Sequence, residues 1–203
     1  MKRRTFDVLA SMVGLGLAAL LIVAGSLLTW AHNFVQDQVH SQLVAQKVFF
    51  PQSNDPQLKD PAFAPVRQYA GQQLTTGQQA EVYADYYIAN HLKEIGGGKT
   101  YAELSGQYLA LSDAQKAAPD GVALNATVQT MFRGETLRGL LLNAYGWGKT
   151  ATIAGIAAVV AFIGAGLMAV LGGLGLWHSR RAKEGQEVFT GHHHGAPAIE
   201  TIS

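Results

Sequence analysis

The sequence ATIAGIAAVVAFIGAGLMAVLGGLGL, residues 151–176, contains 26 consecutive residues without a charged side chain. A helix of this length extends over roughly 39 Å, whereas the hydrocarbon core of a bilayer is about 30 Å thick. We therefore predict a transmembrane helix over residues 150–177. The segment Trp-His-Ser-Arg-Arg, residues 177–181, follows directly. This order is typical of a helix that leaves the bilayer on its cytoplasmic side.

A second uncharged run, residues 8–28, lies close to the N-terminus, behind the basic residues 2–4. A basic start before an apolar run also fits a cleaved signal peptide. The run is long for a signal peptide, however, and the bulky Trp30 lies just before the poor candidate cleavage site. We expect an uncleaved transmembrane helix over residues 8–30, with cleavage as the alternative.

The distribution of basic residues predicts which side of the membrane each segment occupies. Basic residues precede the first span at positions 2–4 and follow the second span within residues 180–183. The positive-inside rule then assigns both termini to the cytoplasm. Residues 1–7 and 178–203 are the expected cytoplasmic segments, and residues 31–149 the expected extracytoplasmic domain. The sequence thus predicts a multi-pass protein of the plasma membrane.

The composition limits the possible functions. The chain has 203 residues, of which 48% are hydrophobic and 14% charged, and its net charge is +1. Such a chain fits two spans and one small domain, and its charge gives no indication of a nucleic-acid partner. Cysteine is absent. Disulfides, thiolate metal sites and cysteine nucleophiles are therefore excluded.

The outer segment starts with apolar residues at helical spacing, so the first span is expected to continue as an amphipathic helix to residue 48. Pro51 ends this helix, and the proline-rich residues 52–65 are expected to form an irregular loop. Capping boxes predict three further helix starts. They are Thr75–Gln78 or Thr76–Gln79, Thr100–Glu103, and Ser112–Gln115.

The remaining outer residues predict one long helix over residues 122–145. It is expected to follow a turn at Asp120-Gly121 and to break near Gly146 and Gly148, before the second span. No stretch alternates apolar and polar residues for long enough to indicate a sheet. We predict an all-α membrane protein in which two transmembrane helices flank an extracytoplasmic antiparallel domain of about four helices.

Three stretches, YAGQQLTTGQQA (residues 69–80), HLKE (91–94) and KTYAEL (99–104), resemble a family of uncharacterised two-span membrane proteins of actinobacteria. The resemblance implies a location in the cell envelope and transfers no catalytic residue. Similar sequences are sometimes labelled aromatic ring-opening dioxygenases. Such an iron site needs two histidines and a carboxylate that converge, and the spacing here does not indicate one.

Two Gly-Lys-Thr triplets, residues 98–100 and 148–150, match the last part of a phosphate-binding loop. That loop needs an earlier glycine, and the corresponding positions hold Lys93 and Asn143. We therefore expect a helix C-cap with its loop at the first triplet and an interfacial hinge at the second.

The histidines offer two candidate sites. His91 and Glu94 are three residues apart, so they could share a proton or a metal ion, but we expect His91 to be a core residue with a polar edge. The consecutive His192, His193 and His194 suit divalent transition metals. We expect an exposed tail without a metal role there, and we predict no cofactor.

Small residues recur every four positions in both spans, and such residues allow close helix packing in lipid. They are Ala10, Gly14 and Ala18 in the first span, and Ala157, Ala161, Ala165, Ala169 and Gly173 in the second. We expect residues 10–18 to pack against residues 165–173, which would leave Ala157 and Ala161 for a partner. The alternative is that alanine and glycine are merely common in membrane helices.

No nucleophile with a nearby base is indicated, so we do not expect an enzyme. The organisation favours a non-catalytic accessory or structural subunit of a larger membrane complex, in contact with lipid and with an integral membrane partner or a second copy. An extracytoplasmic protein that binds a ligand or lipid is the alternative, because five tyrosines could line a pocket: Tyr83, Tyr86, Tyr87, Tyr101 and Tyr108. A sensor is less favoured, because only 26 residues follow the second span.

Overall fold

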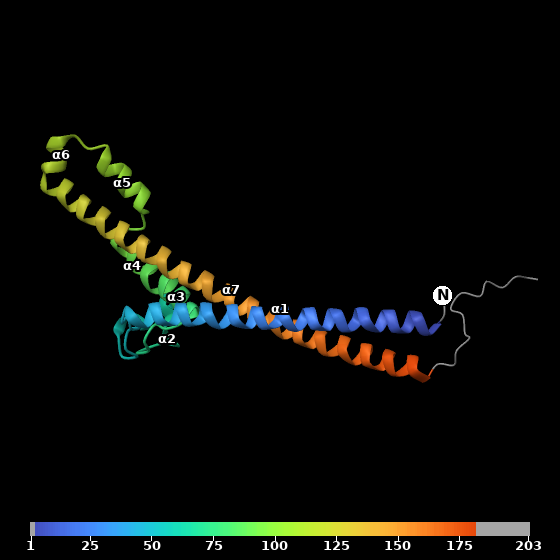
Figure 1. Cartoon of the computed structure of the whole chain (residues 1–203). Helices are drawn as coiled ribbons and strands as arrows, with labels where there is room; N and C mark the ends of the chain where they lie inside the picture. Colours follow the sequence, from blue (N-terminus) through green and yellow to red (C-terminus); the bar gives the residue numbers. More distant parts are fainter. Residues whose placement is uncertain (1–2, 182–203) are drawn as a thin grey trace, which may run out of the picture. The chain divides into compact units, whose positions relative to one another are not determined.

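The computed structural model describes residues 3–181 (Figure 1). Its helices are α1 (Arg3–Ala45), α2 (Ala64–Arg67), α3 (Gly77–Val82), α4 (Ala89–Ile95), α5 (Tyr101–Leu109), α6 (Asp113–Ala117) and α7 (Pro119–Arg181). Two short 3-10 helices, η1 (Pro56–Lys59) and η2 (Pro61–Phe63), precede α2, and a π-helical turn, η3 (Tyr83–Ile88), joins α3 to α4. The described residues form no strand beyond one isolated bridge, between Phe49 and Gln73. The all-α prediction is confirmed.

The chain divides into two compact units. One comprises residues 1–27 and 157–203, and its described part is called the stem. The other, residues 28–156, is called the head. Helices α1 and α7 each contribute to both units.

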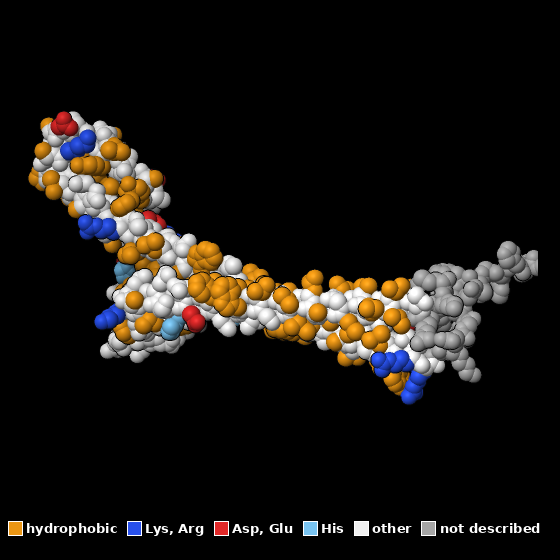
Figure 2. All heavy atoms as spheres, in the orientation of Figure 1, with side chains coloured by type: hydrophobic (Ala, Val, Ile, Leu, Met, Phe, Trp, Pro, Cys, Tyr) orange, Lys and Arg blue, Asp and Glu red, His pale blue; other side chains and the backbone are white. Residues whose placement is uncertain are grey.

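Helices α1 and α7 are long and apolar enough to cross a membrane. Their most apolar 18-residue windows have mean hydropathies of 2.4 and 2.5, yet only 17% and 11% of those windows is buried. Figure 2 shows hydrophobic side chains over much of the stem surface. A helix in the core of a water-soluble protein would bury most of such an apolar window, so the exposed stem surface is better suited to lipid than to water.

In the stem, α1 and α7 contact each other through small residues that recur every seven positions. The buried ones are Ser11, Ala18 and Gly25 on α1, and Ala158, Ala165, Gly172 and Ser179 on α7. A Cβ atom added to Gly172 would lie 2.9 Å from Leu15 Cγ and 3.1 Å from the Ser11 carbonyl oxygen. Residues that repeat every seven positions stay on the face that contacts the neighbouring helix when two helices cross with a left-handed supercoil.

This face differs from the four-residue stripe expected from the sequence. Ala18, Ala161 and Ala165 are buried, whereas Gly14 and Ala157 are half-buried and Ala10, Ala169 and Gly173 are exposed. A step of four residues advances about 40° beyond a full turn, so a four-residue stripe rotates away from a neighbouring helix. The expectation that Ala161 stays free for a partner is wrong, because this residue is only 8% exposed.

The first testable prediction compares two adjacent glycines of α7. Gly172→Leu should lower the free energy of unfolding by about 1–3 kcal/mol, because the larger side chain overpacks the contact with α1. Gly173→Leu should change it little, since a Cβ there would meet no atom within 4 Å. Thermal unfolding of the full chain in mild detergent, followed by circular dichroism, measures both. Equal losses in the two variants would contradict the seven-residue repeat.

The structure confirms the three helix starts predicted between residues 31 and 149. Capping boxes are present at Thr76 with Gln79, at Thr100 with Glu103 and at Ser112 with Gln115. The backbone amide and then the hydroxyl of Thr100 donate to the Glu103 carboxylate, and these bonds lower the pKa of that group below its usual value. Residues 52–65 are more ordered than expected, because Asp55 and Asp60 cap η1 and η2, each of which begins with proline.

The first Gly-Lys-Thr triplet follows the end of α4. The Gly98 amide donates to the Lys93 carbonyl oxygen at 2.8 Å, and the Gly97 amide donates to the Glu94 carbonyl oxygen at 3.0 Å. Gly97 and Gly98 have φ values of +57° and +80°. These features form a Schellman motif, which needs a residue that tolerates positive φ. The expected helix C-cap is therefore present.

Two expected interruptions of the long helix predicted over residues 122–145 and the second span are wrong. Helix α7 begins at Pro119, so Asp120 and Gly121 lie in its first turn, and it continues without a break through Gly146 and Gly148. Proline suits the first position of a helix because its missing amide would have no intrahelical partner there. A glycine inside a helix lowers its stability by about 1 kcal/mol relative to alanine, and packing against other elements can outweigh this loss.

The core of the head consists of two clusters. The larger one joins α1, the segment around Phe50, η1, η2, α2, α3, η3 and the middle of α7. Val66, Leu74 and Ala80 in this cluster are at 0% exposure. The smaller one joins α4, α5 and the start of α7 through Leu92, Leu104, Val128 and Met131. The larger cluster forms the base of the candidate site.

Candidate functional site

The head contains a groove of about 540 Å³ between α1 and α7. Side chains of η3 and the segment after α1 complete its lining. The lining residues are Phe34, Val35, Gln38, Val39, Gln42, Leu43, Gln46, Val48, Tyr83, Ile88, Leu137, Leu140, Leu141, Asn143, Ala144 and Trp147. None of these side chains is charged.

The groove has an apolar floor and a rim of amides. Val39, Leu43 and Leu141 are 6%, 2% and 7% exposed, so they form the floor. The rim consists of the exposed side chains Gln38, Gln42, Gln46 and Asn143. Gln38 and Gln42 lie on α1 four residues apart, which places them along one side of the helix, and Gln46 follows in the turn after α1. The arrangement presents an apolar channel edged by neutral hydrogen-bonding groups.

Large apolar side chains remain exposed along the groove. Phe34 and Trp147 are 50% and 55% exposed, and Leu137 and Leu140 are 52% and 63% exposed. Single exposed apolar residues are common in proteins, but a contiguous set around a cavity marks a place where an apolar molecule binds. The groove is therefore the strongest candidate for a functional site in the described part of the chain.

The π-helical turn η3 supplies two of the lining residues, Tyr83 and Ile88. A π turn holds an extra residue, which shifts the side chains that follow relative to an α-helix, and such turns are frequent at functional sites. In this protein the turn brings both residues into the same lining as α1 and α7.

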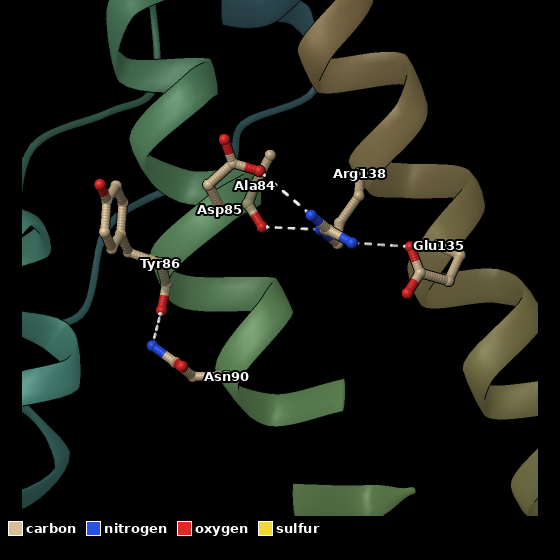
Figure 3. Close-up of polar contacts among 6 residues, drawn as sticks. All are labelled: Ala84, Asp85, Tyr86, Asn90, Glu135 and Arg138. Carbon is tan, nitrogen blue, oxygen red and sulfur yellow. Dashed lines mark hydrogen bonds and ion pairs between the residues drawn. The ribbon is translucent and has the colours of Figure 1, made fainter. Parts of the chain in front are cut away.

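Arg138 holds α7 against η3 (Figure 3). Its Nε donates to the Ala84 carbonyl oxygen at 3.1 Å, its Nη2 donates to Asp85 at 3.1 Å, and its Nη1 donates to Glu135 at 2.8 Å. Its side chain is 25% exposed. Because Leu137 and Leu140 lie on either side of Arg138 in sequence, these bonds also set the position of one groove wall.

The other side of η3 is tied to the loop that follows α1. The Asn90 side-chain amide donates to the Tyr86 carbonyl oxygen at 2.6 Å and to the Ala62 carbonyl oxygen at 3.1 Å. The turn is thus held on one side by α7 and on the other by η2. The groove wall formed by η3 is therefore held by hydrogen bonds within the head.

Tyr83 lies where the groove meets the core. Its ring packs edge-on against Phe50 at 5.2 Å and contacts Tyr87 at 4.7 Å, measured between ring centroids. Burial, and then the neighbouring Tyr87, raise the pKa of Tyr83 to about 12. The phenol therefore stays protonated at neutral pH, so it contributes no charge to the groove.

His91 lies among aromatic rings beside this site. Its Nδ1 is 2.7 Å from the Tyr87 carbonyl oxygen and its Nε2 is 2.7 Å from Gln57 Oε1. Its ring also contacts Phe63 at 5.5 Å between centroids. Both ring nitrogens already have protein partners, so His91 stabilises the loop that carries η1 and does not face the groove.

The other histidines are dispersed. His32 Nδ1 is 2.7 Å from the Ala151 carbonyl oxygen, and His40 Nδ1 is 3.2 Å from the Thr75 carbonyl oxygen. A Cβ on Gly155 would lie 2.9 Å from His32 Nδ1, so this glycine makes room for the ring. Within residues 3–181 no three His, Cys, Asp or Glu side chains gather as metal ligands. His192, His193 and His194 lie outside the described residues.

Of the five tyrosines considered from the sequence, only Tyr83 lines the groove. Tyr87 contacts His91, whereas Tyr101 and Tyr108 pack beside the smaller core cluster. Sequence reasoning missed the walls formed by α1 and α7. The four-residue spacing of Gln38, Gln42 and Gln46 was an available signal.

The second Gly-Lys-Thr triplet has a packing role. A Cβ on Gly148 would lie 3.3 Å from Gly77 Cα, and a Cβ on Gly77 would lie 3.1 Å from the Ala144 carbonyl oxygen. The first turn of α3 thus meets α7 backbone to backbone, directly beside the groove residue Ala144. A hinge at this triplet, as expected from the sequence, is wrong because α7 is continuous there.

Comparison with protein-family models, with curated proteins and with solved structures finds no match for this chain. No activity is therefore suggested by a relative or by a structural neighbour. The functional inference rests on the groove, on its apolar floor and neutral rim, and on the two apolar helices that lead into the head.

Proposed function

We propose that this protein is a non-catalytic, membrane-anchored binding protein that holds an apolar molecule in the groove of its head. The observation that carries the proposal is the groove itself, with its apolar floor, its exposed apolar walls and its uncharged amide rim. Its volume of about 540 Å³ falls within the range of roughly 300–1,000 Å³ that is usual for small-molecule sites. A charged ligand would find no opposite charge in this lining.

We also propose that α1 and α7 cross the plasma membrane over residues 8–30 and 150–177, with both termini in the cytoplasm. The basic residues that flank the spans support this orientation. Trp30 and Trp147, which are 65% and 55% exposed, suit the outer membrane interface, where tryptophan is enriched. The head is then extracytoplasmic, and its groove starts close to the membrane.

The second prediction tests this orientation by labelling single cysteines in intact cells, since the chain has no native cysteine. Ser41→Cys and Ser112→Cys should react with a membrane-impermeant maleimide. His178→Cys should react only after the cells are permeabilised. Ser179 is unsuitable because it is 3% exposed. Labelling of His178→Cys in intact cells would contradict cytoplasmic termini.

The third prediction tests binding with an uncharged apolar photoaffinity probe that carries a diazirine and an alkyne. The full chain in amphipol should be labelled within residues 34–46 and 137–147, and excess unlabelled probe should compete. Leu140→Gln should reduce this labelling several-fold, because it places a polar group in an apolar wall. Mass spectrometry of the labelled peptides is the measurement.

Val122→Gln is the matched control, because Val122 is 58% exposed on the same helix and does not line the groove. It should leave the labelling unchanged. Labelling that is spread over the chain, or that excess probe does not reduce, would contradict a binding site in the groove.

An accessory subunit of a larger membrane complex is the second proposal. Large apolar side chains that do not line the groove are exposed around the smaller core cluster, among them Leu109 at 69%, Val122 at 58% and Phe132 at 51%. A partner protein or a second copy would cover such side chains. Loss of a co-purifying protein in Leu109→Gln, with its retention in Leu140→Gln, would support this role.

The resemblance to two-span actinobacterial proteins stays a prediction. Together with a cell-envelope location, it is compatible with either proposed role.

A further inference from the structure

We propose that the groove binds an ester-linked acyl chain of an outer-leaflet lipid, with the chain on the apolar floor and the ester oxygens at the amide rim. This inference rests on the proposed function and names its ligand class. Three features of the head lead to it: where the groove starts, its length, and the chemistry of its rim.

The groove starts beside the tryptophans that suit the membrane interface. On α1, Phe34 lines the groove and stacks on Trp30, with ring centroids 5.5 Å apart and ring planes inclined at 16°. The two residues are four positions apart, or about 6 Å along the helix. On α7, Trp147 itself lines the groove. On the proposed topology, an outer-leaflet lipid chain would lie next to this end of the groove.

The apolar channel is long. Its wall on α1 extends from Phe34 to Leu43, which corresponds to about 14 Å of helix, and Gln46 and Val48 continue the lining beyond the end of α1. The floor residues Val39 and Leu43 lie along this length, one turn apart. A long narrow apolar surface matches an extended hydrocarbon chain better than a compact ligand, which would contact only part of it.

The rim selects for a neutral hydrogen-bonding group. Gln38 and Gln42 line the groove from α1, Gln46 lines it from the turn after α1, and Asn143 lines it from α7. A side-chain amide can donate to an ester carbonyl oxygen, whereas an ether oxygen is a poorer acceptor. No lysine or arginine lines the groove, so the lining offers no charged partner for a phosphate. The rim can therefore hydrogen-bond an ester group, and we expect the affinity to depend little on the charge of the headgroup.

The test uses Trp147 as a reporter. The chain has three tryptophans, and replacing Trp30 and Trp177 with Phe leaves only Trp147, in the groove lining. Phosphatidylcholine with brominated acyl chains is titrated into the full-length protein in mild detergent. Bromine quenches tryptophan fluorescence at short range. We expect quenching that saturates near one lipid per protein.

Three comparisons make the result specific. Leu140→Gln in the same background should weaken the apparent affinity several-fold, and Val122→Gln should not. Brominated ether-linked phosphatidylcholine should bind about two- to tenfold more weakly than the ester lipid, the loss expected for one hydrogen bond. Brominated diacylglycerol should bind with an affinity similar to that of the phospholipid, because the rim makes no contact that depends on the headgroup.

Several results would overturn the proposal. Quenching that rises linearly with lipid, or that Leu140→Gln leaves unchanged, would mean that Trp147 reports only on lipid in the surrounding micelle. Equal binding of ester and ether lipids would remove the role of the rim. A groove that the apolar photoprobe labels but the brominated lipid does not enter would refute the acyl ligand and leave the binding function intact. Failure of both probes would refute both.

Discussion

Replacing Phe50 with alanine is expected to lower the free energy of unfolding by about 3–5 kcal/mol, the usual cost of removing a buried aromatic ring. Phe50 is 2% exposed and contacts the rings of Tyr69 and Tyr83, each at 5.2 Å between centroids. Its amide donates to the Gln72 carbonyl oxygen at 2.9 Å, which fixes the backbone around the ring. The resulting cavity would lie next to a groove residue.

The neighbouring Phe49 provides the matched control, because it is the same residue type and is 54% exposed. Phe49→Ala should change the free energy of unfolding by about 0.5 kcal/mol or less. Chemical unfolding of the full chain in mild detergent, followed by helical circular dichroism, measures both variants. Because Phe50 supports Tyr83, the Phe50→Ala variant should also bind the apolar probe more weakly. A similar loss of stability in both variants would show that the ring at position 50 is not part of the core.

Two nearby glycines of α7 give the second large effect on the free energy of unfolding. Replacing one with alanine should lower it, and replacing the other should raise it. Gly148→Ala should destabilise the protein by about 1–3 kcal/mol, because its Cβ would lie 3.3 Å from Gly77 Cα. A backbone atom in a packed helix cannot move aside as readily as the end of a flexible side chain. Gly146→Ala should stabilise it by about 0.5–1 kcal/mol, because a Cβ there meets nothing within 4 Å and alanine favours the helix.

The same unfolding measurement gives both values in full-length protein. The Gly148→Ala variant should also reduce probe binding, since the α3 contact lies next to the groove residue Ala144. If both glycine variants stabilise the protein, then α3 and α7 are not in close contact. If both destabilise it, a side chain at position 146 meets neighbouring atoms, which contradicts the open space around Gly146.

The sequence alone predicted the helical elements well where the signal is local. The capping boxes at Thr76, Thr100 and Ser112 were confirmed because a cap involves residues only three positions apart. The two apolar runs predicted the two long helices for a similar reason, since an uncharged stretch of this length has few alternatives. Local chemistry therefore determined the all-α class and most helix starts.

Local signals failed where a neighbouring element decides the outcome. Gly146 and Gly148 suggested a break in α7, but the helix continues because Gly148 packs against Gly77, which is 71 positions away in the chain. In the stem, small residues occur at both four- and seven-residue spacings, and only the facing helix selects the set that is buried.

The candidate groove as a whole could not have been predicted from the sequence, although the four-residue spacing of Gln38, Gln42 and Gln46 was a signal for one edge of it. Its floor and walls combine residues of α1 and α7 that are about 100 positions apart, together with a π-helical turn that has no recognised sequence signal. The amino-acid sequence by itself determined which segments are helical and which are apolar enough for a membrane. Only the tertiary structure decided which helix faces meet and which apolar side chains stay uncovered, because that depends on contacts between segments distant in the chain.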